Sequence, residues 1–124
     1  GSGLPKREFL FVDDLAEAAL FIIENISIDN EILYDENKNF CGIINVGVGS
    51  DISIKELANM ISSIVDYEGE IIWDVSKPDG TPKKLLDISK LKHVGWEAKT
   101  SLKKGIELTL QNYIEELGTK SIRL

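Results

Sequence analysis

Cationic side chains gather in one proline-containing loop of this sequence. The loop runs from Lys77 to Asp87, reads Lys-Pro-Asp-Gly-Thr-Pro-Lys-Lys-Leu-Leu-Asp, and carries three lysines. Pro78 pre-sets a turn, and the Asp-Gly pair that follows tolerates the positive φ that a tight turn needs. Because the chain holds 21 carboxylates against 14 basic residues, lysines gathered on a stiff loop suggest an anionic ligand. The open alternative is a solvated surface loop whose lysines keep it soluble.

Arg7 is the second candidate for anion binding. It heads a segment that turns into a helix, a place from which a guanidinium can present a fixed bidentate fork to phosphate oxygens. If this segment pairs with the one around Leu85 as short strands, Arg7 and Lys84 converge on one diphosphate. An ion pair of Arg7 with Asp13 or Asp87 is an equally open alternative.

Two further motifs match the patterns of dinucleotide enzymes. Gly-Val-Gly at 47–49 follows an expected strand and precedes an expected helix, but Ile52 stands where the third glycine of the fingerprint belongs. We therefore expect a tight strand-to-helix turn there. Tyr34 and Lys38 have the spacing of a catalytic Tyr-x-x-x-Lys, which needs both residues on one helix face. They lie in a polar, asparagine-rich stretch, which favours a chance match.

The cysteine, the histidine and the tryptophans offer little chemistry. Cys41 and His93 are the sole residues of their types, and one of each makes a poor metal-ligand set or nucleophile pair. Trp73 and Trp96 are expected to pack in the core or at its rim.

Composition excludes several classes of function. The net charge of -7 argues against nucleic-acid binding, which needs a basic face. A single cysteine permits no internal disulfide and suits a reducing cytoplasm. The most apolar stretch, residues 15–26, is interrupted by glutamates and is too short to span a bilayer. We expect a soluble, cytoplasmic protein that does not bind membranes.

The hydrophobic pattern predicts an α/β fold with three main helices and a few short strands. The expected helices cover residues 15–26, 54–66 and 102–117, with one or two helical turns at 89–94, and the expected extended segments cover 7–12, 41–46, 70–74 and 85–87. Capping signals mark the helix ends. They are Asp14 with Glu17, Ser53 with Glu56, Thr100 or Ser101, and the glycines Gly95 and Gly118. So few strands suggest the C-terminal piece of a larger protein.

The segment Gly1 to Asp14, Gly-Ser-Gly-Leu-Pro-Lys-Arg-Glu-Phe-Leu-Phe-Val-Asp-Asp, resembles the opening of the C-terminal part of the GDP-L-fucose synthase family. Ile-Asn-Val-Gly-Val-Gly at 44–49, the Ser76–Asp87 stretch and Gly-Trp at 95–96 follow in that family's order. The Ser76–Asp87 stretch is specific, whereas the other motifs are shared with extended short-chain dehydrogenases and sugar-nucleotide epimerases. The resemblance covers nearly the whole chain and is weakest over 25–40.

The resemblance implies an NADP-dependent enzyme that epimerises GDP-4-keto-6-deoxy-D-mannose at C3 and C5 and reduces it at C4. Residues 1–124 would be a single C-terminal substrate-binding part of a Rossmann-type, extended short-chain dehydrogenase fold. The NADP-binding turn and the catalytic residues would lie in an absent N-terminal part, so this chain has none of them. By the same resemblance, Arg7 and Lys84 bind the GDP diphosphate, with Asp79 and Lys83 as further contacts, and the parent enzyme is a homodimer.

Alone, the chain is expected to bind GDP weakly and to catalyse nothing. Two other interpretations stay open. One is the corresponding part of a reductase or epimerase for another GDP-4-keto sugar, such as a heptose. The other is a stand-alone module that binds nucleotide sugars.

Overall fold

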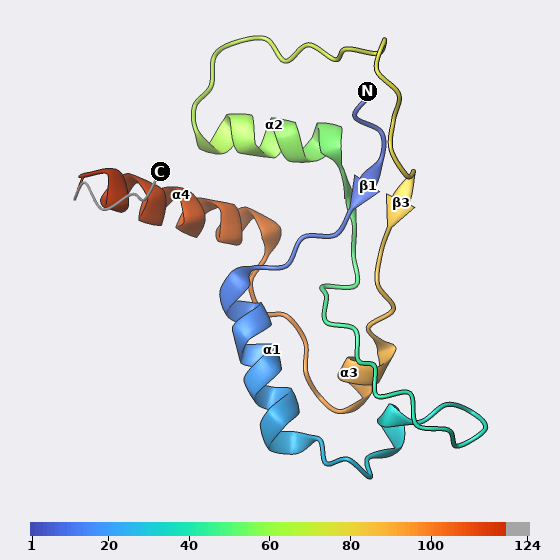
Figure 1. The fold of residues 1–124 in the computed structure, drawn as a ribbon. Helices are drawn as coiled ribbons and strands as arrows, with labels where there is room; N and C mark the ends of the chain where they lie inside the picture. Colours follow the sequence, from blue (N-terminus) through green and yellow to red (C-terminus); the bar gives the residue numbers. More distant parts are fainter. Residues whose placement is uncertain (119–124) are drawn as a thin grey trace.

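A small sheet joins three distant parts of the chain (Figure 1). In the computed structural model, which describes residues 1–118, strand β1 (Lys6–Arg7) lies at the centre of this sheet. It runs antiparallel to β2 (Ile52–Ser53) and parallel to β3 (Lys83–Lys84). Each strand is two residues long, so the sheet fixes the relative position of three loops and adds little core.

Three main helices accompany this sheet, which confirms the predicted α/β class. The helices are α1 (Val12–Asn25), η1 (Glu31–Leu33), α2 (Ile54–Ile64), α3 (Ser89–His93) and α4 (Leu102–Gly118). Figure 1 shows β1 and β3 near the start of α2, with α4 beside α2, while α1 leads away toward α3.

The predicted signals of α2 and α3 are confirmed. Ser53 caps α2, since its hydroxyl oxygen accepts the Glu56 N–H at 3.1 Å while the Glu56 carboxylate accepts the Ser53 N–H at 2.9 Å. After α3, Gly95 adopts a φ of 95°, a conformation that ends the helix at little cost for glycine. Of the two candidates for the cap of α4, it is Ser101 whose hydroxyl accepts the Lys104 N–H, at 3.3 Å.

The predicted capping box at the start of α1 is wrong. The helix begins at Val12, and its N-cap residue Phe11 makes no side-chain cap bond. Asp14 lies inside the first turn and is buried, where its carboxylate accepts the N–H and the hydroxyl of Thr100 at 2.9 and 3.1 Å. Asp14 therefore ties α1 to the segment before α4.

Two of the predicted strands, 41–46 and 70–74, do not form among the described residues. A strand needs a neighbour for its backbone groups, and these segments have none in residues 1–118. Ile43 is 65% exposed and Ile72 is 79% exposed. Of the other extended segments, 7–12 contributes Arg7 alone to the sheet, and β3 lies just before 85–87.

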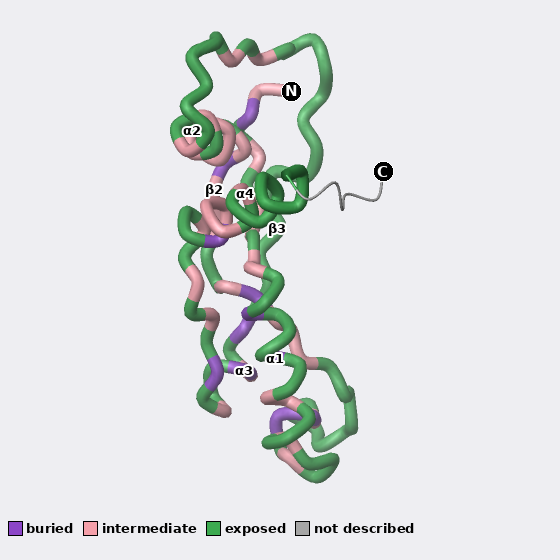
Figure 2. Tube along the Cα trace, turned by 90° about the vertical axis from the view of Figure 1, so that its left-hand side faces the viewer, coloured by how far each residue is buried: buried purple, intermediate pink, exposed green. Residues whose placement is uncertain are grey.

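The core is small and lies between α1 and α3. Ala18, Leu91 and Trp96 are buried together, with Ile22 and Val46 packed against them. Figure 2 shows short buried stretches separated by long exposed ones. Half of the predicted inward face of α4 is exposed, namely Tyr113, Ile114 and Leu117. Gly118 is the last described residue of α4, so its predicted cap lies outside the described part.

Candidate anion-binding site

The sheet register places Arg7 directly opposite Lys84. Because paired residues of neighbouring strands project from the same face, the two cations share one face of the sheet. The condition set by the sequence, that the segment of Arg7 pairs with the one around Leu85, is thus met at Lys83–Lys84. Their neighbours Lys6 and Lys83 are opposite each other as well, and project from the other face.

Asp51 lies on that other face and compensates the two lysines there. Its carboxylate is 3.3 Å from the Lys83 ammonium and 3.8 Å from that of Lys6, and its side chain is 9% exposed. The structure thus places Lys83 on the face away from Arg7, although Lys83 directly precedes Lys84, the residue that pairs with Arg7. The prediction that Lys83 contacts a ligand stays a prediction.

The Arg7 guanidinium is oriented by the backbone. Its Nη1 donates to the carbonyl oxygens of Lys6 at 2.5 Å and Thr81 at 2.8 Å. Within residues 1–118 it forms no ion pair, so neither of the expected carboxylate partners neutralises it. Lys84 likewise makes no side-chain hydrogen bond or ion pair in the described part of the chain. Arg7 and Lys84 are therefore two cations on one sheet face without a carboxylate partner in the described residues, and the anion-binding role expected for them stays a prediction.

A cleft of about 360 Å³ opens beside Arg7. It is formed by the N-terminal segment, the start of α2 and the proline-containing loop. Its lining comprises Gly1, Gly3, Pro5, Arg7, Ile54, Trp73, Asp74, Pro78, Asp79 and Gly80. The lining combines the Arg7 guanidinium and the Trp73 indole ring with two carboxylates, those of Asp74 and Asp79. Lys84 is outside this lining.

Asp79 is part of the cleft wall and holds it together. Its carboxylate accepts the backbone N–H of Ser2 at 2.7 Å and the Ser2 hydroxyl at 2.5 Å. Both hydrogen bonds lower the pKa of Asp79 from its usual 3.8, and the bond from the Ser2 hydroxyl has the larger effect. The proline-containing loop is thereby tied to the N-terminal segment. Opposite it, Gly3 at a φ of 76° packs against the Trp73 ring, where a Cβ would come within 2.5 Å.

The Gly-Val-Gly turn at 47–49 binds an anion that the chain itself supplies. The N–H groups of Val48 and Gly49 both donate to Oε1 of Glu8, each at 2.6 Å. A Cβ on Gly47 would come within 2.6 Å of the same oxygen. Since the carboxylate fills this turn, the turn has no room for a cofactor phosphate. The tight-turn interpretation fits, and the carboxylate explains the glycines.

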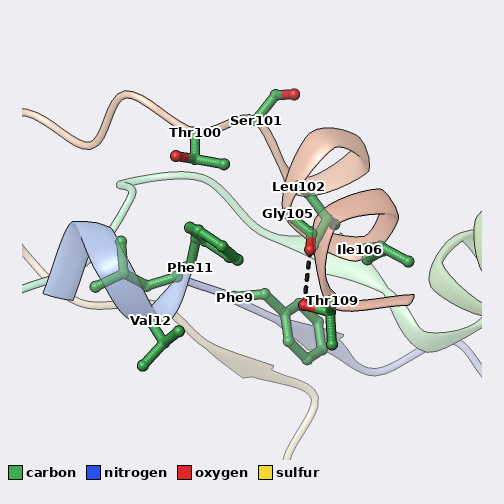
Figure 3. Close-up of a pocket in the computed structure, with 10 residues that line it drawn as sticks. Phe9, Phe11, Val12, Thr100, Ser101, Leu102, Gly105, Ile106 and Thr109 are labelled. Atoms are coloured by element: carbon green, nitrogen blue, oxygen red, sulfur yellow. Dashed lines mark hydrogen bonds between the residues drawn. The ribbon is translucent and has the colours of Figure 1, made fainter. Parts of the chain in front are cut away.

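A second cavity, of about 350 Å³, does not suit an anion (Figure 3). Phe9, Phe11 and Val12 face Leu102 and Ile106 across it. Its polar groups are hydroxyls and backbone, and the Thr109 hydroxyl is already bonded to the Gly105 carbonyl oxygen at 2.7 Å. No charged side chain lines it. It is an apolar hollow between the start of α1 and α4.

The remaining sequence candidates are dispersed. Tyr34 closes a small loop by a bridge to Phe40, and Lys38 occupies the turn at a φ of 62°, so the Tyr-x-x-x-Lys match has no helical setting. Cys41 accepts a hydrogen bond from Lys90 at 3.4 Å, whereas Nε2 of His93 lies 3.8 Å from a carboxylate oxygen of Glu31. Within residues 1–118 no group of acidic, cysteine or histidine side chains has the geometry of a metal site.

Three contributors escaped sequence reasoning: Glu8, Asp51 and the pocket position of Trp73. Each acts on residues more than 30 positions away, for which a local pattern carries no signal. The one available hint is that Glu8 directly follows Arg7, since alternation along an extended segment sends it to the opposite face.

The chain has similar proteins of known name and structure. No family model matches the sequence. The chain is 44% identical over 115 residues to the GDP-L-fucose synthase of Escherichia coli (strain K12), covering 93% of this chain and 35% of that protein. A crystal structure of a GDP-6-OMe-4-keto-L-xylo-heptose reductase from C. jejuni has a TM-score of 0.85 at 39% identity, over 94% of this chain and 33% of that one.

A third relative carries a cofactor. It is a GDP-mannoheptose C4 reductase from Campylobacter jejuni with NADP bound, with a TM-score of 0.77 and 38% identity over 92% of this chain and 33% of that one. This chain spans about a third of the length of the proteins it matches. By sequence and fold it is similar to the C-terminal part of extended short-chain dehydrogenases that act on GDP-sugars, which confirms the resemblance found in the motifs.

Proposed function

We propose that this chain is the GDP-sugar-binding part of an NADP-dependent enzyme of the GDP-L-fucose synthase type. The observation that carries the proposal is the register of Arg7 opposite Lys84, beside a cleft walled by Asp79. Both cations lack a carboxylate partner within residues 1–118. A diphosphate bearing two or more negative charges matches this pair, and bidentate recognition by arginine adds geometric selectivity.

The whole enzyme would epimerise GDP-4-keto-6-deoxy-D-mannose at C3 and C5, then reduce its C4 ketone with a hydride from NADPH and a proton. The described residues do not fit a role in holding NADP, since the Gly-Val-Gly turn at 47–49 is filled by the Glu8 carboxylate. Cofactor binding and catalysis therefore belong to a separate N-terminal part, and the chain alone binds without turnover. The homodimer and the cytoplasmic location stay predictions.

The outer face of α1 supports a partner part of this kind. Four large apolar side chains lie along one stripe of the helix and are exposed. They are Val12, Leu15, Leu20 and Ile23. The neighbouring segment 41–46 has a strand-like sequence and no strand beside it in residues 1–118. A Rossmann-type sheet that adds this segment as a strand and covers the stripe would bury both.

The test is a calorimetric titration of GDP into the chain and its variants. Arg7→Ala and Lys84→Ala should each weaken binding by about 1–3 kcal/mol, the range for charge-assisted hydrogen bonds. Lys6→Ala is the matched control, because it removes a cation from the same strand but on the Asp51 face, and it should leave the affinity within about twofold. Lys83→Ala tests the predicted extra contact.

Saturable binding that Lys6→Ala weakens as much as Arg7→Ala would refute the assigned face. If this chain by itself reduced a GDP-4-keto sugar with NADPH, the proposal that cofactor binding and catalysis belong to a separate part would be refuted.

A GDP-heptose reductase is a second candidate, favoured by the TM-score of 0.85 to the C. jejuni heptose enzyme. The two candidates share the GDP site and differ in the sugar. Titration of GDP-L-fucose against a GDP-heptose into the same chain distinguishes them, since the preferred sugar should bind more tightly than GDP alone.

A further inference from the structure

We propose that Glu8 is a positioning residue that holds Lys84 opposite Arg7, and so assembles the anion site from the other side of the sheet. The inference rests on the proposed function for its consequence in binding. The tie itself is a property of the chain. Glu8 would touch no ligand.

The geometry of Glu8 joins three segments. Its Oε1 accepts the N–H groups of Val48 and Gly49 at 2.6 Å each, and its Oε2 accepts the N–H of Leu86 at 3.0 Å. Glu8 directly follows β1, and Leu86 lies two residues beyond the end of β3. One carboxylate thus links the segment that follows β3 to the end of β1 and to the turn before β2.

Hydrogen bonds hold the chain in place on both sides of Lys84. On its N-terminal side, the Lys6 N–H donates to the Pro82 carbonyl oxygen at 2.8 Å. On its C-terminal side stands the bond from Leu86 to Glu8. The sheet between them is two residues long, which is too short to fix a register unaided. Leu85 and Leu86 are both exposed, so burial adds little hold there.

A carboxylate is required in this place. Three backbone N–H donors converge on it, and both of its oxygens accept. A glutamine offers one oxygen and a donor NH₂ group, which would face at least one N–H without an acceptor. Gly47 is the other half of the arrangement, because a Cβ at that position would come within 2.6 Å of Oε1 and displace the carboxylate.

The experiment compares Glu8→Gln and Gly47→Ala with the wild-type chain. Glu24→Gln is the matched control, since Glu24 is exposed near the end of α1. Amide hydrogen exchange, followed by NMR, reports the tie without any ligand. Both variants should speed exchange at Leu86 by tenfold or more, while amides in the middle of α4 keep their rates.

Calorimetry then reports the consequence. Glu8→Gln should raise the Kd for GDP by about tenfold, the loss expected for one charge-assisted hydrogen bond, and should leave guanosine binding unchanged. In a Lys84→Ala background the same substitution should have no further effect on GDP, because a residue that acts through Lys84 cannot act in its absence.

The outcomes separate the two proposals. Unchanged exchange at Leu86 in both variants overturns the tie, as does unfolding of both variants, which would make Glu8 a general requirement of the fold. A GDP loss that adds fully to that of Lys84→Ala overturns the route through Lys84. Failure of the wild-type chain to bind GDP refutes the proposed function, and the exchange result still decides the tie.

Discussion

Removing the Leu91 side chain tests whether the small cluster between α1 and α3 is what holds this chain together. Leu91 is 1% exposed and is the largest fully buried side chain in the described residues. Leu→Ala substitutions in cores cost about 2–5 kcal/mol, and less where the surroundings can collapse into the space. Because α3 has five residues and the side chains packed around the buried cluster are only partly buried, we expect the lower part of that range, about 2–3 kcal/mol.

Urea unfolding followed by circular dichroism measures this loss. With an m-value of about 1.5 kcal/mol/M, typical of a small protein, the midpoint should fall by about 1.3–2 M. Ile23→Ala is the control, since it removes as large an aliphatic group from a helix position that is 79% exposed. It should change the free energy of unfolding by no more than about 0.5 kcal/mol.

Equal losses in Leu91→Ala and Ile23→Ala would refute this description of the core. They would mean that the outer face of α1 is buried in solution, for example against a second copy, and carries as much stability as the cluster.

Three further outcomes follow from the structure. Ser53→Ala removes the cap of α2 and should lower stability by about 1 kcal/mol in urea unfolding, whereas Ser63→Ala, an exposed change within the same helix, should not. The anchoring of Ser2 by Asp79 is present above the ordinary pKa of 3.8 and should be lost as the pH falls through the lowered folded pKa, visible as a shift of the Ser2 amide signal. Gly3→Ala meets an indole ring at positive φ and should lower the melting temperature.

The sequence predicted elements whose signals are local. Ser53 and Glu56 complete each other within one helical turn, and Gly95 ends α3 by its own backbone freedom, so neither depends on the rest of the fold. The convergence of Arg7 and Lys84 is conditional on the sequence alone, because it requires that the segments of Arg7 and Leu85 pair as short strands. The structure shows that pairing at Lys83–Lys84, and the parallel register places Lys84 opposite Arg7.

The errors share one physical cause, which is a partner that lies far away in the chain. The 41–46 segment has the composition of a strand but lacks a neighbouring strand in the described residues, and composition does not reveal neighbours. Asp14 and Glu17 have the spacing of a capping box, but the Asp14 carboxylate accepts hydrogen bonds from Thr100 instead. The turn at 47–49 is also recognisable as an anion binder, whereas the identity of its anion, Glu8, depends on how β1 is placed.

Because both residues of β3 are lysines, a shift of β3 by one residue in one direction would still place a lysine opposite Arg7. If β3 slipped so that Lys83 faced Arg7, a lysine would still accompany the arginine, and Asp51 would lose one of its two cations. A slip the other way would set Leu85 against Arg7 and leave the site with a single charge. Ion pairing with Asp51 therefore opposes a shift of β3 in only one of the two directions. The Pro82 carbonyl and the bond from Leu86 to Glu8 must oppose it in both, which makes the length of the loop between Pro78 and Leu86 less tolerant of insertion than its exposure suggests.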